Sequence, residues 1–175
     1  MGEIRSYSLD PDTKTKLKMC LFKNVQNVYI IRNNIVKGVW NCTAIKPSLV
    51  VDPLQIAVAA NRAVVAEKAG NMVTRTVYGE ILYNLSLSKN ISQSLSKFGV
   101  EKDNVLLMCF LVNEKDESEN IISQIQGELC PISDLHKFTN MKEVKSVYKL
   151  NTIKSDFDLL DIIVSRMVTK NFVTY

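Results

Sequence analysis

The segment SLVVDPLQIAVAANRAVVAEKAG, residues 48–70, is apolar over most of its length. Asp52 is a good N-cap, Pro53 suits the first position of a helix, and Gly70 suits the left-handed position past a helix end. The segment therefore predicts a helix over residues 53–69 that is buried over much of its surface. An Asn-Arg pair in the middle of so apolar a helix requires an explanation.

Strands are predicted on both sides of this helix. IRSYSL (4–9) and KLKMCLF (16–22) are separated by the turn-like DPDTK, which favours a hairpin. NVLLMCFLV (104–112) is a continuous apolar run, so we expect it in the middle of the sheet. ELCPI (128–132) predicts a short edge strand that Pro131 ends.

Further helices are predicted where apolar residues recur every three or four positions. They cover about residues 25–38, 74–85, 90–99, 121–126 and 155–172, with Thr74 or Thr76 as the cap of the second. Residues 113–120 predict an exposed polar loop, and residues 141–150 fit a helix or a strand. Because strands and helices are mixed without regular alternation, repeat or linker, we expect one α+β domain over residues 1–175.

The last predicted helix carries charges in an order that suits a helix dipole. Ser155 is its expected cap, Asp156 and Asp158 lie in its first turn, and Arg166 and Lys170 lie near its end. Acidic groups are favoured near the start of a helix and cations near its end. We expect the polar sides of this helix to carry Asp158, Asp161, Ser165, Arg166 and Lys170.

The composition is that of an ordinary globular chain, with 46% hydrophobic and 23% charged residues. The net charge of +4 permits contact with nucleic acid or an acidic partner but does not argue for it. No apolar run is long enough to predict a membrane span, and no secretory segment is evident. The start, MGEIRS, fits a loose myristoylation pattern, but the alternation from Ile4 onward favours a strand.

The sequence contains no catalytic or metal-binding motif. The four cysteines are far apart and His136 is the only histidine, so we predict no metal site and no cofactor. Cys20 and Cys109 lie in apolar segments, where a free thiol behaves as a small buried hydrophobe. His136 lies in a polar stretch typical of a surface residue, and the scattered glycines form no phosphate-binding loop. A binding module, rather than an enzyme, is the expected class.

Four stretches together resemble one protein family. They are VVDPLQIAVAANRAV (50–64), TRTVYGEILYNLSLSKNISQSLSKFG (74–99), EVKSVYKL (143–150) and LLDIIVSRMVTK (159–170). The family is that of the kinase-binding small subunits of the KEOPS (EKC) complex, in which similar stretches occur in the same order and at nearly the same spacing. No single motif is a chemical signature, and the specificity comes from several matches in one order.

The resemblance implies a two-layer α+β sandwich, with an antiparallel sheet packed against helices, and a role without catalysis. Family members bind the amino-terminal lobe of the small atypical kinase/ATPase (PRPK-type) of the complex, and reach the remaining KEOPS subunits through it. The complex makes the threonylcarbamoyl modification of adenosine 37 in tRNAs that read codons beginning with A. Archaeal members bind the single-stranded CCA end of tRNA. The resemblance also implies a cytoplasmic and nuclear location, with no membrane partner.

Given this resemblance, cations and amides around the buried helix are candidate RNA contacts. Arg62 and Arg75 lie thirteen residues apart across a glycine turn, so they can converge with Lys68 on the phosphates of a single strand. Amide groups suit base edges. The RNA-binding candidates are Asn61, Arg62, Lys68, Arg75 and Asn84. The alternative is that Asn61 bonds neighbouring backbone and Arg62 only extends out of the core. We expect Glu80 to pair with Arg75 or a nearby lysine.

The last helix offers a candidate kinase contact. Its apolar stripe is wider than the core of a thin fold needs, and an exposed apolar strip can anchor an interface. The kinase-binding candidates are Leu159, Leu160, Ile163, Val164 and Met167. The alternative is that the whole stripe packs on the sheet.

Two other functions stay open at this point. One is a kinase regulator without RNA contact, and removal of the CCA end from tRNA would then make no difference in a binding assay. A small enzyme whose site no motif reveals would show a pocket lined by converging titratable groups.

Overall fold

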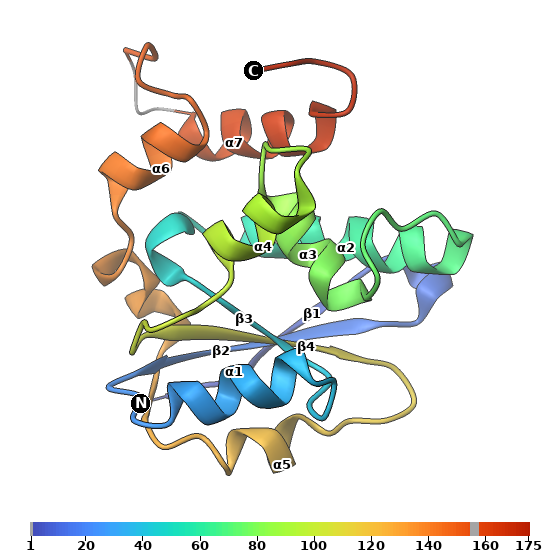
Figure 1. Cartoon of the computed structure of the whole chain (residues 1–175), viewed down its shortest axis with the longest axis vertical. Coiled ribbons are helices and arrows are strands. Elements are labelled where there is room, and N and C mark those ends of the chain that lie inside the picture. The colour runs from blue at the N-terminus through green and yellow to red at the C-terminus, as the bar shows by residue number, and fades with distance from the viewer. Residues whose placement is uncertain (1, 155–157) are drawn as a thin grey trace.

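A five-stranded antiparallel sheet forms the centre of the protein in a computed structural model that describes residues 2–154 and 158–175 (Figure 1). The strands run in the order β1-β2-β4-β3, and β5 pairs with β2 on the edge that β1 also uses. Their bounds are β1 (Arg5–Ser8), β2 (Lys16–Lys23), β3 (Thr43–Ile45), β4 (Leu106–Val112) and β5 (Glu128–Cys130). The predicted hairpin, the central position of β4 and the short edge strand β5 are confirmed.

Both faces of the sheet are buried, which explains why β4 is apolar at consecutive positions. Successive side chains of a strand point to opposite faces. Leu107 and Cys109 of β4 join one core cluster, whereas Leu106, Met108 and Phe110 join a second cluster on the other face. A strand covered on both faces has no solvent side for polar residues.

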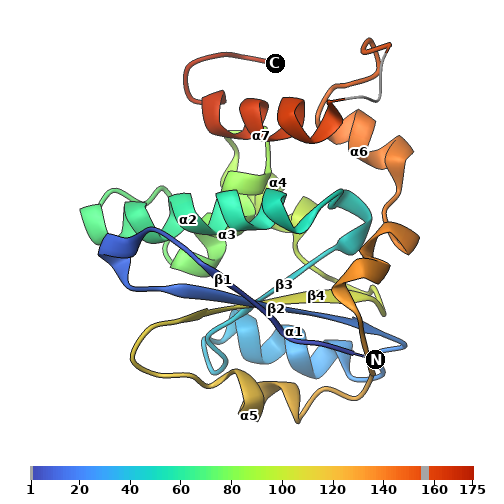
Figure 2. The same cartoon turned by 180° about the vertical axis from the view of Figure 1, so that it is seen from behind.

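The helices lie on both faces of the sheet. Their bounds are α1 (Val28–Val36), α2 (Pro53–Ala69), α3 (Val77–Leu85), α4 (Ile91–Phe98), α5 (Ser118–Ile122), α6 (Met141–Val147) and α7 (Leu159–Thr169), with the 3-10 turns η1 (Pro11–Thr13), η2 (Pro47–Leu49) and η3 (Ile132–Lys137). Helices α2 and α3 cover one face, and α1 and α5 lie on the other (Figure 2). The α+β class and the antiparallel sheet are confirmed, and α1 and α5 add a layer beyond the two that were expected.

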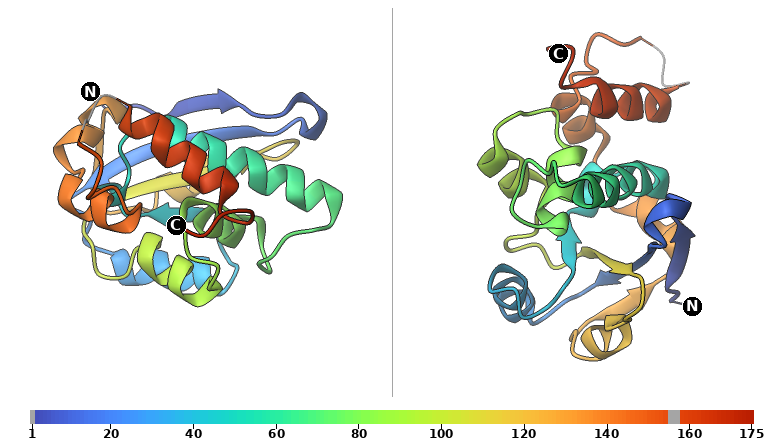
Figure 3. Two further views of the ribbon diagram at one scale, coloured as in Figure 1. Left: turned by 90° about the horizontal axis from the view of Figure 1, so that it is seen from above. Right: turned by 90° about the vertical axis from the view of Figure 1, so that its right-hand side faces the viewer.

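Helix α7 does not rest on the sheet. It lies on the outer side of α2 and α3, so that these two helices separate it from the strands (Figure 3). Among the described helices, none has the length and apolar character needed to cross a membrane.

The predicted capping residues define several helix ends. Asp52 accepts a hydrogen bond from the amide of Leu54, and Gly70 ends α2 with φ 70°. The hydroxyl of Thr76 accepts from the amide of Gly79, which identifies Thr76 as the cap of α3. Asn90 caps α4 in the same way. Because a cap needs only neighbouring atoms, these ends could be predicted from sequence.

Other boundaries differ from the prediction. Helix α1 begins at Val28, and α5 begins at Ser118, inside the segment predicted to be a loop. The ambiguous segment 141–150 is helical as far as Val147. Strand β3 was not predicted. The expected cap Ser155 and the expected first-turn residue Asp156 lie outside the described residues.

Candidate functional site

The stripe of α7 divides into a buried half and a surface half. Leu159, Ile163 and Met167 belong to the core cluster that α2 and α3 share, and Ile163 is completely buried. Leu160 and Val164 are half-buried and belong to neither core cluster. Of the five predicted kinase contacts, therefore, Leu160 and Val164 are open to a partner, and the other three hold α7 to the fold.

An apolar surface continues from these two residues to the end of the chain. Leu160, Val164 and Val168 follow one another at intervals of four on α7, and Phe172 lies three residues past its last residue, Thr169. We call these four apolar residues the outer stripe. The side chain of Phe172 is 86% exposed, and its neighbour Val173 is also exposed. An aromatic ring left in water at the end of an apolar strip is typical of a binding surface.

The segment after α7 is held against the body of the protein. The Tyr175 hydroxyl lies 2.5 Å from the Thr169 hydroxyl, and its ring lies 5.0 Å from the guanidinium carbon of Arg166. Lys149 donates a hydrogen bond to the backbone oxygen of Tyr175. These contacts fix the chain on both sides of Phe172 and present its ring at the surface.

Of the two cations expected on a polar side of α7, Arg166 is half-buried, whereas Lys170 is buried, so the expectation is wrong for Lys170. Arg166 donates to the carbonyl oxygens of Tyr148 and Lys149, both at 2.7 Å, and thereby closes the end of α6. Lys170 is only 3% exposed. Since it follows Ile163 by seven positions, helical spacing places it on the core face.

The Lys170 ammonium is surrounded by carbonyl oxygens of α3 and of the turn that follows. It donates to Tyr83, to Ser86 at 2.8 Å and to Ser88 at 3.2 Å, and it lies 3.5 Å from the centre of the Tyr83 ring. Burial, together with the nearby Arg62 cation, lowers the pKa of Lys170 to about 8. The ammonium thus caps the end of α3 and fixes the turn after it.

The two amide candidates for RNA contact have structural partners. The Asn61 side-chain oxygen accepts from the amide of Asp10 at 2.7 Å, which ties α2 to the turn between β1 and β2. The Asn84 amide group donates to the carbonyl of Ala59 at 3.1 Å, and Asn84 is buried between α3 and α2. The alternative expectation, that Asn61 bonds backbone atoms, therefore describes its contact.

The three cationic candidates have different surroundings. Lys68 donates to the carbonyl of Asp12 in the hairpin turn. Arg62 is half-buried on the side of α2 that faces Lys170. Arg75 is exposed in the loop between α2 and α3 and lines an apolar groove between α1 and the α3–α4 pair. Among the described residues, no hydrogen bond or ion pair brings these three side chains into one cluster.

Glu80 does not pair with Arg75 or a lysine, as was expected. Its buried carboxylate accepts from the amides of Val73 and Thr74 at 3.0 and 2.8 Å, and from the Thr74 hydroxyl at 2.5 Å. Backbone amides offer a fixed set of donors to a buried carboxylate. Glu80 thus shapes the loop on which Arg75 lies.

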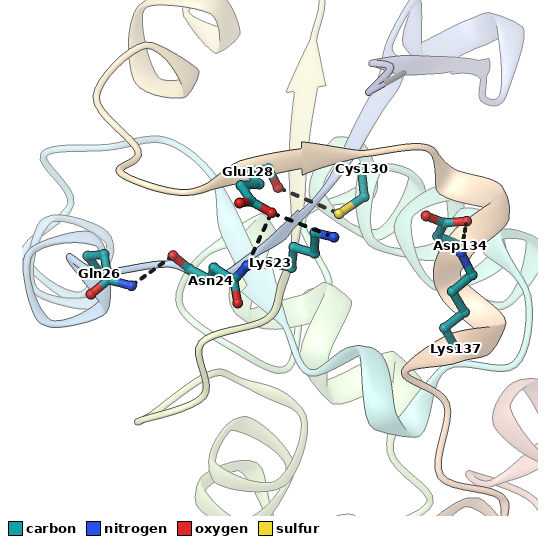
Figure 4. Close-up of polar contacts among 7 residues, drawn as sticks. All are labelled: Lys23, Asn24, Gln26, Glu128, Cys130, Asp134 and Lys137. Carbon is teal, nitrogen blue, oxygen red and sulfur yellow. Dashed lines mark hydrogen bonds and ion pairs between the residues drawn. The ribbon is translucent and has the colours of Figure 1, made fainter.

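A group of polar residues lies where β5 pairs with β2 (Figure 4). Glu128 accepts from the side-chain amide of Asn24 at 3.1 Å and lies 3.6 Å from the Lys23 ammonium. Lys137 holds the pKa of the half-buried Asp134 carboxyl below its ordinary value through a 3.0 Å ion pair. The Glu128 contacts join β5 to the end of β2, the Asp134–Lys137 pair lies within η3, and these contacts do not converge on a pocket.

The thiols are not activated as nucleophiles. All four cysteines are free and buried, and burial raises the pKa of Cys20 and of Cys42 to about 12. A reactive thiol requires a lowered pKa. Within residues 2–154 and 158–175, no group of three or more His, Cys, Asp or Glu side chains is arranged to hold a metal ion.

Comparison with known proteins identifies the family. The family model for the kinase binding protein CGI-121 matches residues 22–171. The EKC/KEOPS complex subunit TPRKB of Danio rerio is 37% identical over 155 residues, covering 86% of this chain and 89% of that protein. The EKC/KEOPS complex subunit CGI121 of Yarrowia lipolytica is 28% identical over 144 residues, covering 80% and 83% of the two chains. With its α+β fold and a family match over most of its length, this chain belongs to the CGI-121 family of kinase-binding proteins.

Proposed function

We propose that this chain is a non-catalytic subunit of KEOPS that binds the small atypical kinase of the complex through the outer stripe of α7. In this role it supports threonylcarbamoylation of adenosine 37 in tRNAs that read codons beginning with A. The family match supports kinase binding. The observation that carries the choice of surface is the outer stripe, with half-buried Leu160 and Val164 outside both core clusters and Phe172 exposed.

The outer stripe suits a protein partner for two physical reasons. Burying apolar surface is the main favourable term in association, and aromatic anchors contribute most of it. The stripe is also rigid, because Leu159, Ile163 and Met167 fix α7 on its other side. A rigid surface loses little conformational entropy when a partner binds.

Co-purification of the kinase with variants of this chain tests the surface. Val164→Asp would bring a carboxylate into an apolar contact, and we expect it to weaken kinase binding at least about tenfold. Ser165→Asp is the matched control, since it adds the same charge at the next, exposed position of α7. Equal retention of the kinase by both variants would place the interface elsewhere.

We further propose that the chain helps to bind the CCA end of tRNA through Arg62, Lys68 and Arg75. Asn61 and Asn84 are assigned a structural role instead, because their contacts lie within the fold. Lys68 and Arg75 are exposed and Arg62 is half-buried, and such cations suit a single strand, since each neutralised phosphate releases counterions. Lys89 lies near Lys170 together with Arg62, and it extends the cationic surface.

The salt dependence of tRNA binding tests this second proposal. Changing Arg62, Lys68 and Arg75 to Ala should weaken tRNA binding. The slope of log affinity against log salt concentration should become less steep by about 2, because each contact with a single strand contributes about 0.7. The control changes three other exposed lysines to Ala, so that both variants lose three positive charges. These lysines are Lys102, Lys115 and Lys142. If trimming the CCA end leaves wild-type affinity unchanged, the chain is a kinase-binding adaptor without a specific RNA contact.

A further inference from the structure

A pocket of about 760 Å³ lies between α4, the end of α6 and the turn after α3. Its lining includes three lysines and four serines, and Glu101 is its only acidic residue. We call it the lysine–serine pocket. The residues that carry the argument are Lys46, Lys97, Lys149, Ser96, Ser146 and Gln93. None of them is among the candidates for kinase or RNA contact.

The positive charge of the pocket is only partly compensated by the residues that the structure describes: Glu101 is in the lining, and Lys149 donates a hydrogen bond to an oxygen of Tyr175. Glu101 lies 3.9 Å from Arg32 of α1, so its charge is shared with that cation. Lys97 has no hydrogen-bond or ion-pair partner among the described residues. Lys46 makes one long hydrogen bond, 3.4 Å, to the carbonyl of Ser96. The Lys46 and Lys97 ammonium groups are therefore the least compensated charges of the pocket, and like charges around one hollow repel one another unless an anion lies between them.

Helix dipoles do not account for these lysines. The end of α6 already receives two hydrogen bonds from Arg166, and the end of α4 receives one from the amide of Gly99. Lys149 itself donates to the backbone oxygen of Tyr175. This contact shows that the Lys149 ammonium can reach an oxygen acceptor on a segment other than α6.

One wall of the pocket is held in place. Ser86, Leu87 and Ser88 form it, and Lys170 binds the carbonyl oxygens of Ser86 and Ser88 from behind. The Ser86 hydroxyl also accepts from the amide of Ser88. A preformed wall lowers the entropy cost of binding a small ligand.

We propose that the lysine–serine pocket binds a nucleoside phosphate, either as a free nucleotide or as one unit of an RNA strand. The phosphate lies between the Lys46 and Lys97 ammonium groups and accepts from the hydroxyls of Ser96 and Ser146. The base lies against Leu87 and Val147, the apolar part of the lining. The volume fits one nucleotide, since small-molecule pockets span about 300–1,000 Å³. The inference does not depend on the tRNA proposal, which uses other residues.

Titration of the isotope-labelled chain with AMP, followed by amide NMR shifts, tests the pocket. AMP at millimolar concentration should shift the amides of residues 86–88, 96–97 and 146–149, and adenosine should not. Lys46→Ala with Lys97→Ala should weaken AMP binding about tenfold, because it removes two charge-assisted contacts. Lys115→Ala with Lys142→Ala is the control with the same loss of charge outside the pocket. The thermal midpoint of each variant confirms that it is folded.

Each outcome decides the proposal. Shifts that require the phosphate, and that only the pocket variant weakens, support it. Equal shifts with adenosine, equal loss in the control variant, or no shift of the pocket amides would overturn it. A short single-stranded RNA then separates the two sources. Tighter binding of the strand to the same amides identifies RNA, whereas binding of AMP alone identifies a free nucleotide.

Discussion

The ammonium of Lys170 lies 3.5 Å from the centre of the Tyr83 ring and donates to the Tyr83 carbonyl oxygen. One side chain at the end of α7 therefore contacts both the ring and the backbone of one residue near the end of α3. A ring face and a carbonyl oxygen both stabilise a cation, but neither carries a full negative charge. Lys170 is thus a buried cation whose hydrogen-bond and ring contacts are partial charges, while the nearby Glu80 carboxylate acts to raise its pKa. Its titration should be visible in the stability of the protein.

Stability should respond to pH through this lysine. The pKa of Lys170 is lowered to about 8, whereas lysine in an unfolded chain titrates near pH 10.4. Between these values the unfolded chain binds more protons, so the native state gains stability as pH rises. We expect a gain on the order of 3 kcal/mol across the window. Urea unfolding at a series of pH values measures it.

A variant isolates this contribution from that of the thiols. The raised pKa values of the Cys20 and Cys42 thiols act in the opposite direction. Above about pH 8.5 these thiols ionise in the unfolded chain but not in the folded protein, so the folded protein loses stability as the pH rises. The unfolding free energy of the wild type, minus that of Lys170→Met, should therefore increase between pH 8 and 10. A constant difference would show that Lys170 titrates normally.

The two halves of the α7 stripe should respond differently to the same charge. Ile163→Asp places a carboxylate in the core and should lower the unfolding free energy by about 4 kcal/mol or more. Val164→Asp should cost much less, because that position lies outside both core clusters. Thermal melting by circular dichroism compares them. Similar midpoints for both variants would contradict the division of the stripe.

A buried hydrogen-bond chain should stabilise the contact between α6 and α2. The Tyr148 hydroxyl donates to the Leu85 carbonyl and accepts from the side-chain amide of Gln55, each at 2.7 Å. Tyr148→Phe removes both bonds and should reduce the unfolding free energy by about 1–3 kcal/mol. The exposed Tyr29→Phe serves as the control in the same urea titration. Equal stability of the two variants would mean that the chain of bonds contributes nothing net.

The loop before α3 should depend on Glu80. Glu80→Ala leaves the amides of Val73 and Thr74 without their acceptor, so these amides should exchange with deuterium much faster. Glu80→Gln keeps an acceptor oxygen and should exchange at an intermediate rate. Exchange measured by NMR at these two amides is the readout. Unchanged protection in the Ala variant would assign the loop geometry to other contacts.

Local signals in the sequence predicted much of the fold. Asp52, Thr76 and Asn90 cap the helices that follow them, because a cap depends on atoms two or three residues away. The unbroken apolar run of β4 correctly indicated a central strand. Strand β3 has only three residues and lacks a periodic signal, so the prediction missed it. The second helical layer was missed because no local pattern states which face of the sheet a helix covers.

The candidate site was less predictable, since it depends on contacts between distant segments. The partner of Asn61 lies 51 residues away, and that of Asn84 lies 25 residues away. The burial of Lys170 was not predicted, although its spacing from Ile163 and Met167 already placed it on the core face of the helix. The carbonyl oxygens that accept its protons lie more than 80 residues earlier in the chain and could not be inferred.

Because its four thiols are buried, the folded protein should react only slowly with alkylating reagents. A thiol that is both inaccessible and protonated reacts slowly, whereas the same thiol in an unfolded chain reacts at the ordinary rate. A cysteine introduced on the surface can therefore be labelled with a fluorophore while the native ones remain unmodified. Conversely, the appearance of reactive native thiols reports the opening of the core, so the chain contains its own unfolding probe.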